Sequence, residues 1–226
     1  MDKSNTDQLH AVMLLATLKP SPQRSNTDLL CRYTARYFTK NNAASEVIRL
    51  VDYHILPGLK RDMGEGDQWP EIIPKLLASD IIIFATPIWW GLQSSLMQRV
   101  IERLDTENDT LLETGISPFA NKAGGIVITG AEDGAQHIIA NLCNFMVWNG
   151  LTMPPACSVS RLGDIPEDKS DEEIFAMFDS ESTKDMAEVM ARNLTHIVRL
   201  LHRDPYKDKR VNRTNISAGA VGIRHK

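Results

Sequence analysis

The chain has 226 residues, of which 42% are hydrophobic and 24% charged, and its formal net charge is −4. This composition is that of an ordinary folded domain and excludes a disordered or collagen-like chain. No apolar run approaches the roughly 20 residues that span a bilayer, so no membrane span is expected. The three cysteines, Cys31, Cys143 and Cys157, are widely spaced. Their spacing argues against a disulfide framework and against a zinc or iron–sulfur site, and it favours a reducing, cytoplasmic location.

Five apolar runs are continuous rather than alternating, as expected of strands that are buried on both faces of a parallel sheet. The first run also has the length of a signal-peptide core, but its leader carries Asp2 and Asp7, and Lys19-Pro20 is no cleavage site. We therefore predict that it is a buried strand. The five runs are Leu9–Leu18, Glu46–Val51, Ile81–Thr86, Gly125–Thr129 and a weaker one at Met153–Val159.

Apolar stripes at helical spacing lie between and after these runs, over Leu29–Phe38, Leu96–Leu104, Ile138–Met146 and Met186–Leu201. Trp69–Leu77 is a shorter candidate helix, weakened by Pro74. Strands that alternate with helices predict βαβ units and a parallel sheet. Five such units favour a flavodoxin-like doubly wound α/β fold, with five parallel strands in the order 2-1-3-4-5 and helices on both faces.

Charge is distributed unevenly toward the end of the chain. Residues 202–226 hold seven Lys or Arg and two Asp, whereas residues 163–188 hold ten acidic side chains and two lysines. We expect one domain over residues 1–202, followed by a basic tail over residues 203–226 that is extended or disordered. A basic tail can bind nucleic acid. On a domain that is otherwise acidic, such a tail is more often a solvated end of the chain, so no nucleic-acid partner is expected.

Ligands of such a sheet bind beyond the carboxyl ends of the strands, near the point where the strand order reverses. The first, third and fourth predicted strands are neighbours there, so the loops after them are the candidates for a site. The first loop, residues 17–27, places hydroxyls, an amide and two cations before a helix. Free N–H groups and the helix dipole there attract an anion such as phosphate. Ser25, Asn26 and Thr27 would serve equally well as ordinary helix caps, and this alternative stays open.

The other two loops are short and contain aromatic or small residues. Trp89 and Trp90 follow the third strand and cannot both point into the core. A flat aromatic there can be a platform for a planar ring, or it can simply cap the edge of the sheet. Gly130 and Gly134 follow the fourth strand, and glycine lets backbone approach a ligand closely, although a plain turn would use the same residues. Three such loops at one switch point favour a shared ligand site.

The run Ala85-Thr-Pro-Ile-Trp-Trp-Gly91, followed by Ser94–Arg103, resembles the NADPH-dependent FMN reductase family of flavodoxin-like proteins, which carry T-P-I-Y/W-W-G there. Residues 129–135 are similar to that family's third flavin loop, and Ser25–Thr27 to the end of its phosphate loop. The resemblance covers residues 9 to 160. In two departures from the family, the first loop lacks the usual Gly-Ser opening and is longer, and the cysteines of related iron–sulfur flavoproteins are absent.

The resemblance implies that the three loops bind FMN. The phosphate would lie at Ser25, Asn26 and Thr27, with Thr17 and Lys19 in place of the family's earlier Ser-x-Arg and with Ser21 able to replace Thr17. The ribityl chain and the isoalloxazine ring would be lined by Pro87, Ile88, Trp89, Trp90 and Gly91. The pyrimidine edge of the ring would contact Thr129, Gly130 and the neighbouring backbone at Ala131, Asp133 and Gly134.

The resemblance further implies an FMN-dependent NAD(P)H oxidoreductase, in which NADPH or NADH gives hydride to FMN and the electrons pass to a quinone, flavin or similar small-molecule acceptor. Hydride transfer between stacked rings is direct, so no catalytic side chain and no metal is expected. Oligomers are usual for the family, which implies a homodimer or homotetramer. Two alternatives remain open: a flavodoxin-type protein that takes electrons from a partner protein, and a flavin-free interaction protein on the same scaffold.

Overall fold

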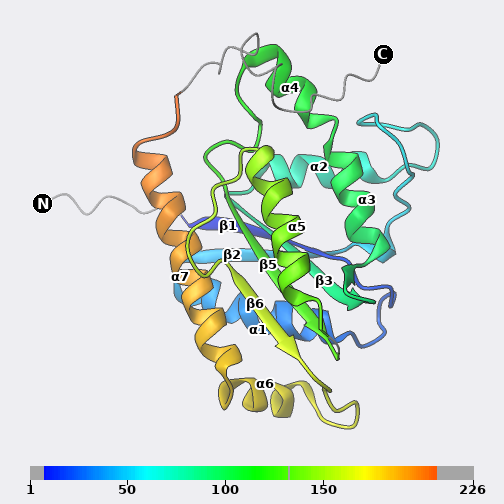
Figure 1. Cartoon of the computed structure of the whole chain (residues 1–226), viewed down its shortest axis with the longest axis vertical. Coiled ribbons are helices and arrows are strands. Elements are labelled where there is room, and N and C mark those ends of the chain that lie inside the picture. The colour runs from blue at the N-terminus through cyan, green and yellow to red at the C-terminus, as the bar shows by residue number, and fades with distance from the viewer. Residues whose placement is uncertain (1–7, 132, 208–226) are drawn as a thin grey trace, which may run out of the picture.

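The computed structural model describes residues 8–131 and 133–207, in which one sheet lies between two layers of helices (Figure 1). Five strands pair in parallel in the order β2-β1-β3-β5-β6, and this order confirms the predicted flavodoxin-like fold. A short strand, β4 (Leu92–Gln93), pairs antiparallel with the end of β3. The parallel strands are β1 (Leu9–Leu15), β2 (Ala43–Arg49), β3 (Ile81–Trp89), β5 (Ala123–Gly130) and β6 (Ser158–Leu162).

Each face of the sheet is covered by its own set of helices, because successive side chains of a strand point to opposite faces. Met13 of β1 enters the core beneath α1 (Asn26–Lys40), α6 (Asp171–Asp179) and α7 (Ser182–Arg203). Leu14 enters the core beneath α2 (Trp69–Ala78), α3 (Ser95–Leu104) and α5 (Ala135–Trp148). Two short helices, η1 (Leu50–Asp52) and α4 (Glu107–Thr114), lie in the connections.

Several predicted strand ends are displaced in the structure. β1 ends at Leu15 rather than Leu18, and the chain then turns into the first loop. β2 begins at Ala43 and ends at Arg49, because this edge strand carries half-buried polar residues that interrupt the apolar run. β6 begins at Ser158 rather than Met153, since two prolines at positions 154 and 155 lack the N–H groups that a ladder requires.

The predicted helices are all present, and α2 forms although Pro74 lies inside it. Two further helices, α4 and α6, were not predicted. Each of them buries few side chains: α6 buries Ile174 and Phe178, and the only buried side chain of α4 is Glu107. Ser170 and Glu173 form a capping box at the start of α6, which is the sequence signal that could have located that helix.

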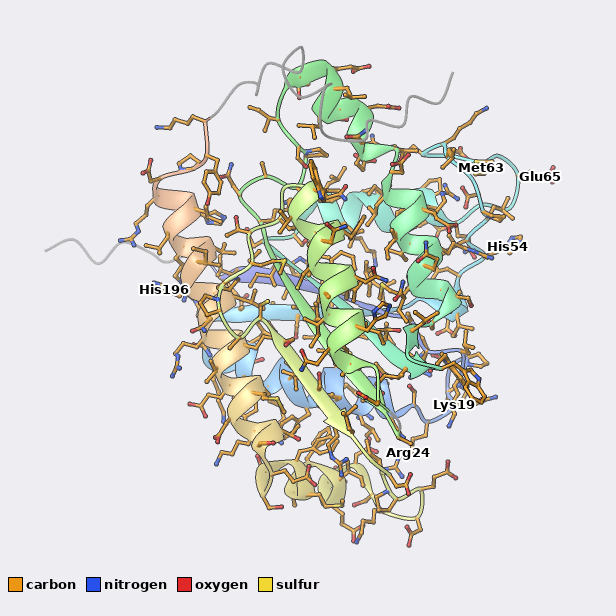
Figure 2. The ribbon with its side chains drawn as sticks, in the orientation of Figure 1. Lys19, Arg24, His54, Met63, Glu65 and His196 are labelled. Atoms are coloured by element: carbon orange, nitrogen blue, oxygen red, sulfur yellow. The ribbon has the colours of Figure 1, made fainter. Side chains whose placement is uncertain are left out.

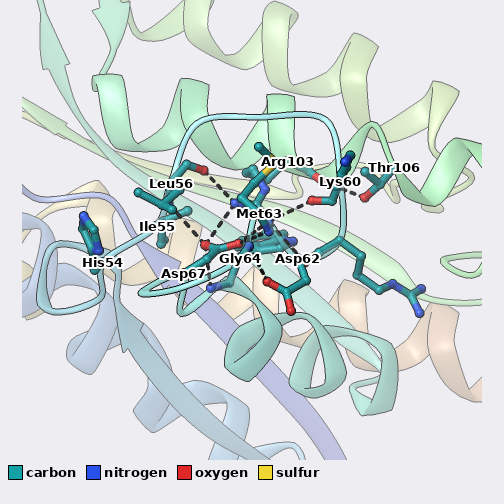
Figure 3. A network of polar contacts seen from close by, with 12 residues as sticks. His54, Ile55, Leu56, Lys60, Asp62, Met63, Gly64, Asp67, Arg103 and Thr106 are labelled. Carbon is teal, nitrogen blue, oxygen red and sulfur yellow. Dashed lines mark hydrogen bonds and ion pairs between the residues drawn. The ribbon is translucent and has the colours of Figure 1, made fainter.

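A buried ion pair fixes the long connection from η1 to α2, residues 53–68 (Figure 3). Arg103 of α3 and Asp67 are both fully buried, and Arg103 Nη2 lies 2.8 Å from Asp67 Oδ2. Burial alone would raise the pKa of Asp67, but hydrogen bonds from Arg103 and from backbone N–H groups hold it well below its usual range. Arg103 also donates to the carbonyls of Leu56, Lys60 and Arg61, and Asp67 accepts from the N–H groups of Leu56, Met63 and Trp69.

The predicted boundary after residue 202 falls at the end of α7, whose last residue is Arg203. Beyond this helix, the backbone N–H of Tyr206 donates to Asn121 Oδ1 at 2.7 Å. Most of the predicted basic tail, residues 208–226, lies outside the described residues. None of the helices formed by residues 8–131 and 133–207 combines the length and the apolarity that crossing a bilayer requires.

Candidate functional site

The loops that follow β1, β3 and β5 meet at the carboxyl edge of the sheet. The strand register explains this, because Leu15 pairs with Ala85 and Pro87 pairs with Thr129. Lys19 lies at this edge, toward which the arrows of β5 and β6 point (Figures 1 and 2). Residues more than 100 positions apart in the sequence therefore contribute to one site, as the predicted strand order required.

Hydroxyl groups join the three loops directly. Thr27 Oγ1 at the start of α1 lies 2.7 Å from Thr129 Oγ1 at the end of β5, and both side chains are buried. Ser94 Oγ donates to the carbonyl of Ala16 at 2.7 Å, and Ser94 N–H donates to Thr86 Oγ1 at 3.0 Å. Buried hydroxyls are costly when they lack a partner, so these bonds fix the loops relative to one another.

The loop after β5 lies directly against the turn after β3. Gly134 has a φ of 127°, and a Cβ at this position would lie only 2.5 Å from the Cα of Gly91. A Cβ at Gly130 would lie 2.8 Å from the side chain of Ile88. From the sequence, these two glycines are expected to let a ligand approach the backbone. The structure shows a different reason for glycine at these positions, since it lets one loop approach the other more closely than a residue with a Cβ would.

The first loop ends at the N-terminus of α1, where Ser25 is the N-cap. Its hydroxyl accepts from the N–H of Asp28 at 3.4 Å, and its carbonyl accepts from the N–H of Leu29 at 3.0 Å. The N–H groups of Asn26 and Thr27 precede these two and lie in the first turn, where a helix supplies no acceptor of its own. The capping role and the anion-binding role are therefore compatible, since they use different donors.

The other predicted residues of this loop have different surroundings. Thr17 is buried, and its hydroxyl accepts from the N–H of Lys19 at 3.3 Å, while the Lys19 side chain is exposed. Ser21 lies beside η1, where its hydroxyl and its N–H donate to the carboxylate of Asp52 at 2.6 and 2.9 Å. With its proton already donated to Asp52, Ser21 has no free donor in this conformation to replace Thr17.

Arg24, the second cation of the first loop, points toward the acidic segment of residues 163–188. It donates to the carbonyls of Glu167 and Lys169 at 2.9 and 2.5 Å, and its Nη2 lies 3.5 Å from Asp171 Oδ1. Arg32 of α1 pairs with the same carboxylate at 2.7 Å. The acidic segment, in which the sequence showed no motif, is thus attached to the loop and the helix of the candidate phosphate site.

The third strand was expected to end at Thr86, but β3 extends to Trp89, and Trp90 and Gly91 form the tight turn into β4. Trp90 and Gly91 both have positive φ, 49° and 78°, which is the pattern of a two-residue type I′ turn. A positive φ is strained for a residue as bulky as tryptophan, and such strain is typical of functional loops. The Trp89 side chain is 50% exposed and that of Trp90 89% exposed, which agrees with the expectation that the two cannot both point into the core.

In the third loop, which follows β5, the groups that could contact a ligand are mainly backbone groups. Thr129 is buried, whereas Ala131 and Asp133 are exposed. Asp133 Oδ1 accepts from the N–H of Gly134 at 2.7 Å, and the carbonyl of Gly130 accepts from the N–H of Gly163 at 2.8 Å. Over residues 8–131 and 133–207, no group of three or more His, Cys, Asp or Glu side chains is arranged to hold a metal ion.

Arg49, at the end of β2, belongs to this site but was not predicted. Its guanidinium donates to the carbonyls of Lys19 and Gln23 and pairs with Asp28. The sequence signal was weak, since it consists of a single arginine near the end of a predicted strand. Its role depends on the path of the first loop, which the sequence pattern does not specify.

The chemistry of these residues suits a flavin mononucleotide. Free N–H groups at the start of α1 suit a phosphate, and the exposed indoles of Trp89 and Trp90 suit a planar ring. Residues 13–162 match the sequence model of the NADPH-dependent FMN reductases, and all three loops lie inside this range. The chain belongs to this family. The resemblance noted in the sequence is thereby confirmed: the protein is an FMN-dependent oxidoreductase, with FMN as cofactor and NAD(P)H as co-substrate.

Among its relatives, the 8-demethyl-8-aminoriboflavin-5'-phosphate synthase of Streptomyces davaonensis is 28% identical over 213 residues, 88% of this chain and 80% of that protein. The crystal structure of RosB with bound 8-demethyl-8-formylriboflavin-5'-phosphate has a TM-score of 0.77 and 26% identity, and the match covers 96% of this chain and 91% of that one. The divalent metal cation transporter MntH of Mycobacterium bovis is 36% identical over 162 residues, 70% of this chain. The chain spans only 24% of that transporter's length.

Proposed function

We propose that this oxidoreductase passes hydride from NADPH or NADH to its bound FMN and then delivers the electrons to a quinone, a free flavin or a similar small acceptor. The observation that carries the proposal is the joining of three loops at one edge, with the Thr27–Thr129 hydrogen bond between them. When bound, FMN supplies the two-electron hydride chemistry, so the chain needs to supply only position and electrostatics.

In this proposal the start of α1 binds the phosphate. The N–H groups of Asn26 and Thr27 donate to phosphate oxygens, and the dipole of the 15-residue helix favours their negative charge. Thr17 Oγ1 accepts from the N–H of Lys19 and so keeps its own proton to donate. The exposed ammonium of Lys19 adds a positive charge at the mouth of the loop.

The hairpin after β3 and the loop after β5 would hold the flavin ring. Pro87, Ile88 and the two tryptophans would form the apolar side, and the backbone groups of Gly130, Ala131, Asp133 and Gly134 would face the pyrimidine edge. Because Gly134 packs on Gly91, these two sides have a fixed separation. A fixed separation orients the ring so that a nicotinamide can stack on its remaining face.

Anaerobic titration of the FMN-loaded protein with NADPH and with NADH tests the proposal. If the protein is a reductase, either nucleotide converts the oxidised flavin directly to its two-electron reduced form, and the yellow colour disappears. If the flavin stays oxidised with both nucleotides yet is reduced by light, the proposal fails, and the electron-transfer protein is supported instead. If the protein binds no flavin, the interaction protein on the same scaffold is supported.

A second candidate function treats the flavin as substrate. It is favoured by the likeness to RosB, which extends over 96% of the chain, and that structure holds a riboflavin 5'-phosphate altered at carbon 8. Mass spectrometry of flavin recovered after turnover separates the two functions. Unchanged FMN supports the reductase, and a mass change at carbon 8 supports the second candidate.

The homodimer or homotetramer expected for the family is part of the proposal, and so is a cytoplasmic location. Light scattering of the purified protein measures the mass of the oligomer. A mass equal to that of the single 25.3 kDa chain would contradict the expected assembly.

A further inference from the structure

Arg49 is a cation that lies outside the three candidate flavin loops but contacts the first of them. Arg49 is the last residue of β2, and its side chain is only 13% exposed. A buried guanidinium is costly unless its donors are used, and here they are used by the first loop and by α1. Arg49 thus connects the edge strand of the sheet to the candidate phosphate site.

The first contacts of Arg49 close the loop. Arg49 Nη1 donates to the carbonyl of Lys19 at 3.2 Å and to that of Gln23 at 2.8 Å. Between these two carbonyls, the N–H of Gln23 donates to the carbonyl of Pro20 at 2.8 Å and forms a turn. Arg49 therefore binds both ends of the turn and holds two carbonyl oxygens, whose partial negative charge would otherwise be free to repel an anion.

The remaining contacts of Arg49 are electrostatic. Asp28 lies in the first turn of α1, and its carboxylate is 3.3 Å from Arg49 Nη2. Asp52 is the second carboxylate beside this loop. Burial tends to raise the pKa of Asp52, but the hydrogen bonds from Ser21 and the charge of Arg49 lower it below its ordinary value. Two carboxylates thus flank the loop, and Arg49 attracts both of them.

We propose that Arg49 is a positioning residue for the phosphate of the flavin. It fixes the backbone of residues 19–23 and offsets part of the negative charge of Asp28 and Asp52, so that the start of α1 presents a more positive potential to the anion. It does not touch the phosphate itself. The inference rests on the proposed function only in requiring that the ligand carry a phosphate at this loop.

The test compares FMN with riboflavin, which has the same ring and no phosphate. The variant is Arg49→Met, and the matched control is Arg32→Met, because Arg32 also pairs with Asp28, at 3.0 Å, but makes none of the loop contacts. Dissociation constants are measured by quenching of flavin fluorescence. We expect Arg49→Met to weaken FMN binding about 10- to 100-fold, the range for losing a charged hydrogen-bonding group.

The expected result has a second part, because riboflavin binding should change by less than about threefold in the same variant. Arg32→Met should change neither constant by more than about threefold, since the Arg32 side chain is 42% exposed and solvent screens its pairs with Asp28 and Asp171. An equal loss for FMN and riboflavin would show a purely structural role for Arg49 and overturn the inference, and so would an unchanged preference for FMN.

Two further variants keep the test informative if Arg49→Met folds poorly. Arg49→Lys keeps the charge but loses the paired donors, and it should weaken FMN binding less than the methionine variant does. Adding Asp28→Asn to Arg49→Lys should strengthen FMN binding again, and failure of this rescue would contradict the electrostatic part. If the natural chain shows no preference for FMN over riboflavin, the proposed phosphate site fails. If it shows one that the Arg49 variants retain, only this inference fails.

Discussion

Replacing Thr27 by valine keeps the shape of the side chain but removes the hydroxyl that bonds Thr129 at 2.7 Å. Thr27 and Thr129 are both at least 97% buried, so removing one hydroxyl leaves the other without this bond and without access to water. We expect each single variant, Thr27→Val or Thr129→Val, to lose about 1–3 kcal/mol of unfolding free energy. The double variant has no orphaned hydroxyl and should lie close to the natural chain, so the coupling energy equals the sum of the two single losses, about 2–6 kcal/mol.

Urea unfolding of the four proteins without flavin, followed by circular dichroism, measures this cycle. Threonine and valine have similar helix propensities, so the exchange at the start of α1 adds little of its own. Losses that simply add in the double variant would refute the reasoning, because they would show that the hydroxyls act independently. The start of α1 and the end of β5 would then not be coupled through this bond.

Gly134→Ala is expected to lose at least about 1–3 kcal/mol more unfolding free energy in urea than Gly64→Ala, because Gly64 shares the positive φ but faces open space. Arg103→Met should cost about 3–5 kcal/mol, since it leaves the carboxylate of Asp67 buried and unpaired. Because folding lowers the pKa of Asp67, the ionised carboxylate stabilises the fold above an unfolded pKa of about 3.9, and this stabilisation is lost as pH falls toward the folded pKa. The difference between natural chain and variant, measured by urea unfolding at each pH, should therefore shrink below about pH 4. Trp90→Asn should raise the thermal midpoint, with a gain of about 1 kcal/mol from relieving the positive φ of tryptophan.

Each of these expectations has an outcome that contradicts it. Equal losses in the two glycine variants would assign the cost to φ alone and not to the contact between loops. A difference between natural chain and Arg103→Met that stays constant down to pH 2 would show that Asp67 does not gain its stability from the ionised form. An unchanged or lower midpoint in Trp90→Asn would mean that the exposed indole makes stabilising contacts that outweigh the strain.

The central strands were predictable because they are buried on both faces. Ile81–Thr86 and Gly125–Thr129 are continuous apolar runs, and both lie inside the observed β3 and β5. The edge strand β2 has solvent on one side, so Ser45 and Glu46 interrupt its pattern and shift its predicted bounds. In α6, acidic residues flank the short apolar run Ile174–Phe178 at both ends, and their charge obscured the helical pattern of this run.

The site was predictable only as far as it follows from strand order. That order brings three loops to one edge, and the sequence shows which residues each loop contains. The contact between Gly91 and Gly134 and the reach of Arg49 to the carbonyl of Gln23 depend on the exact path of each loop. Such paths are set by contacts between distant segments, which a local pattern does not encode.

The match to the family ends at residue 162, yet the protein does not end its core there. Leu194 and Val198 of α7 pack in the same core as Met13 and Val127 of the sheet. A fragment cut where the family match ends would leave this side of the sheet covered by α1 alone, and would also remove the carbonyls that Arg24 binds. The segment that matches the family is thus shorter than the segment that forms the core, and gene fusions or truncations that keep only the former should yield aggregating protein.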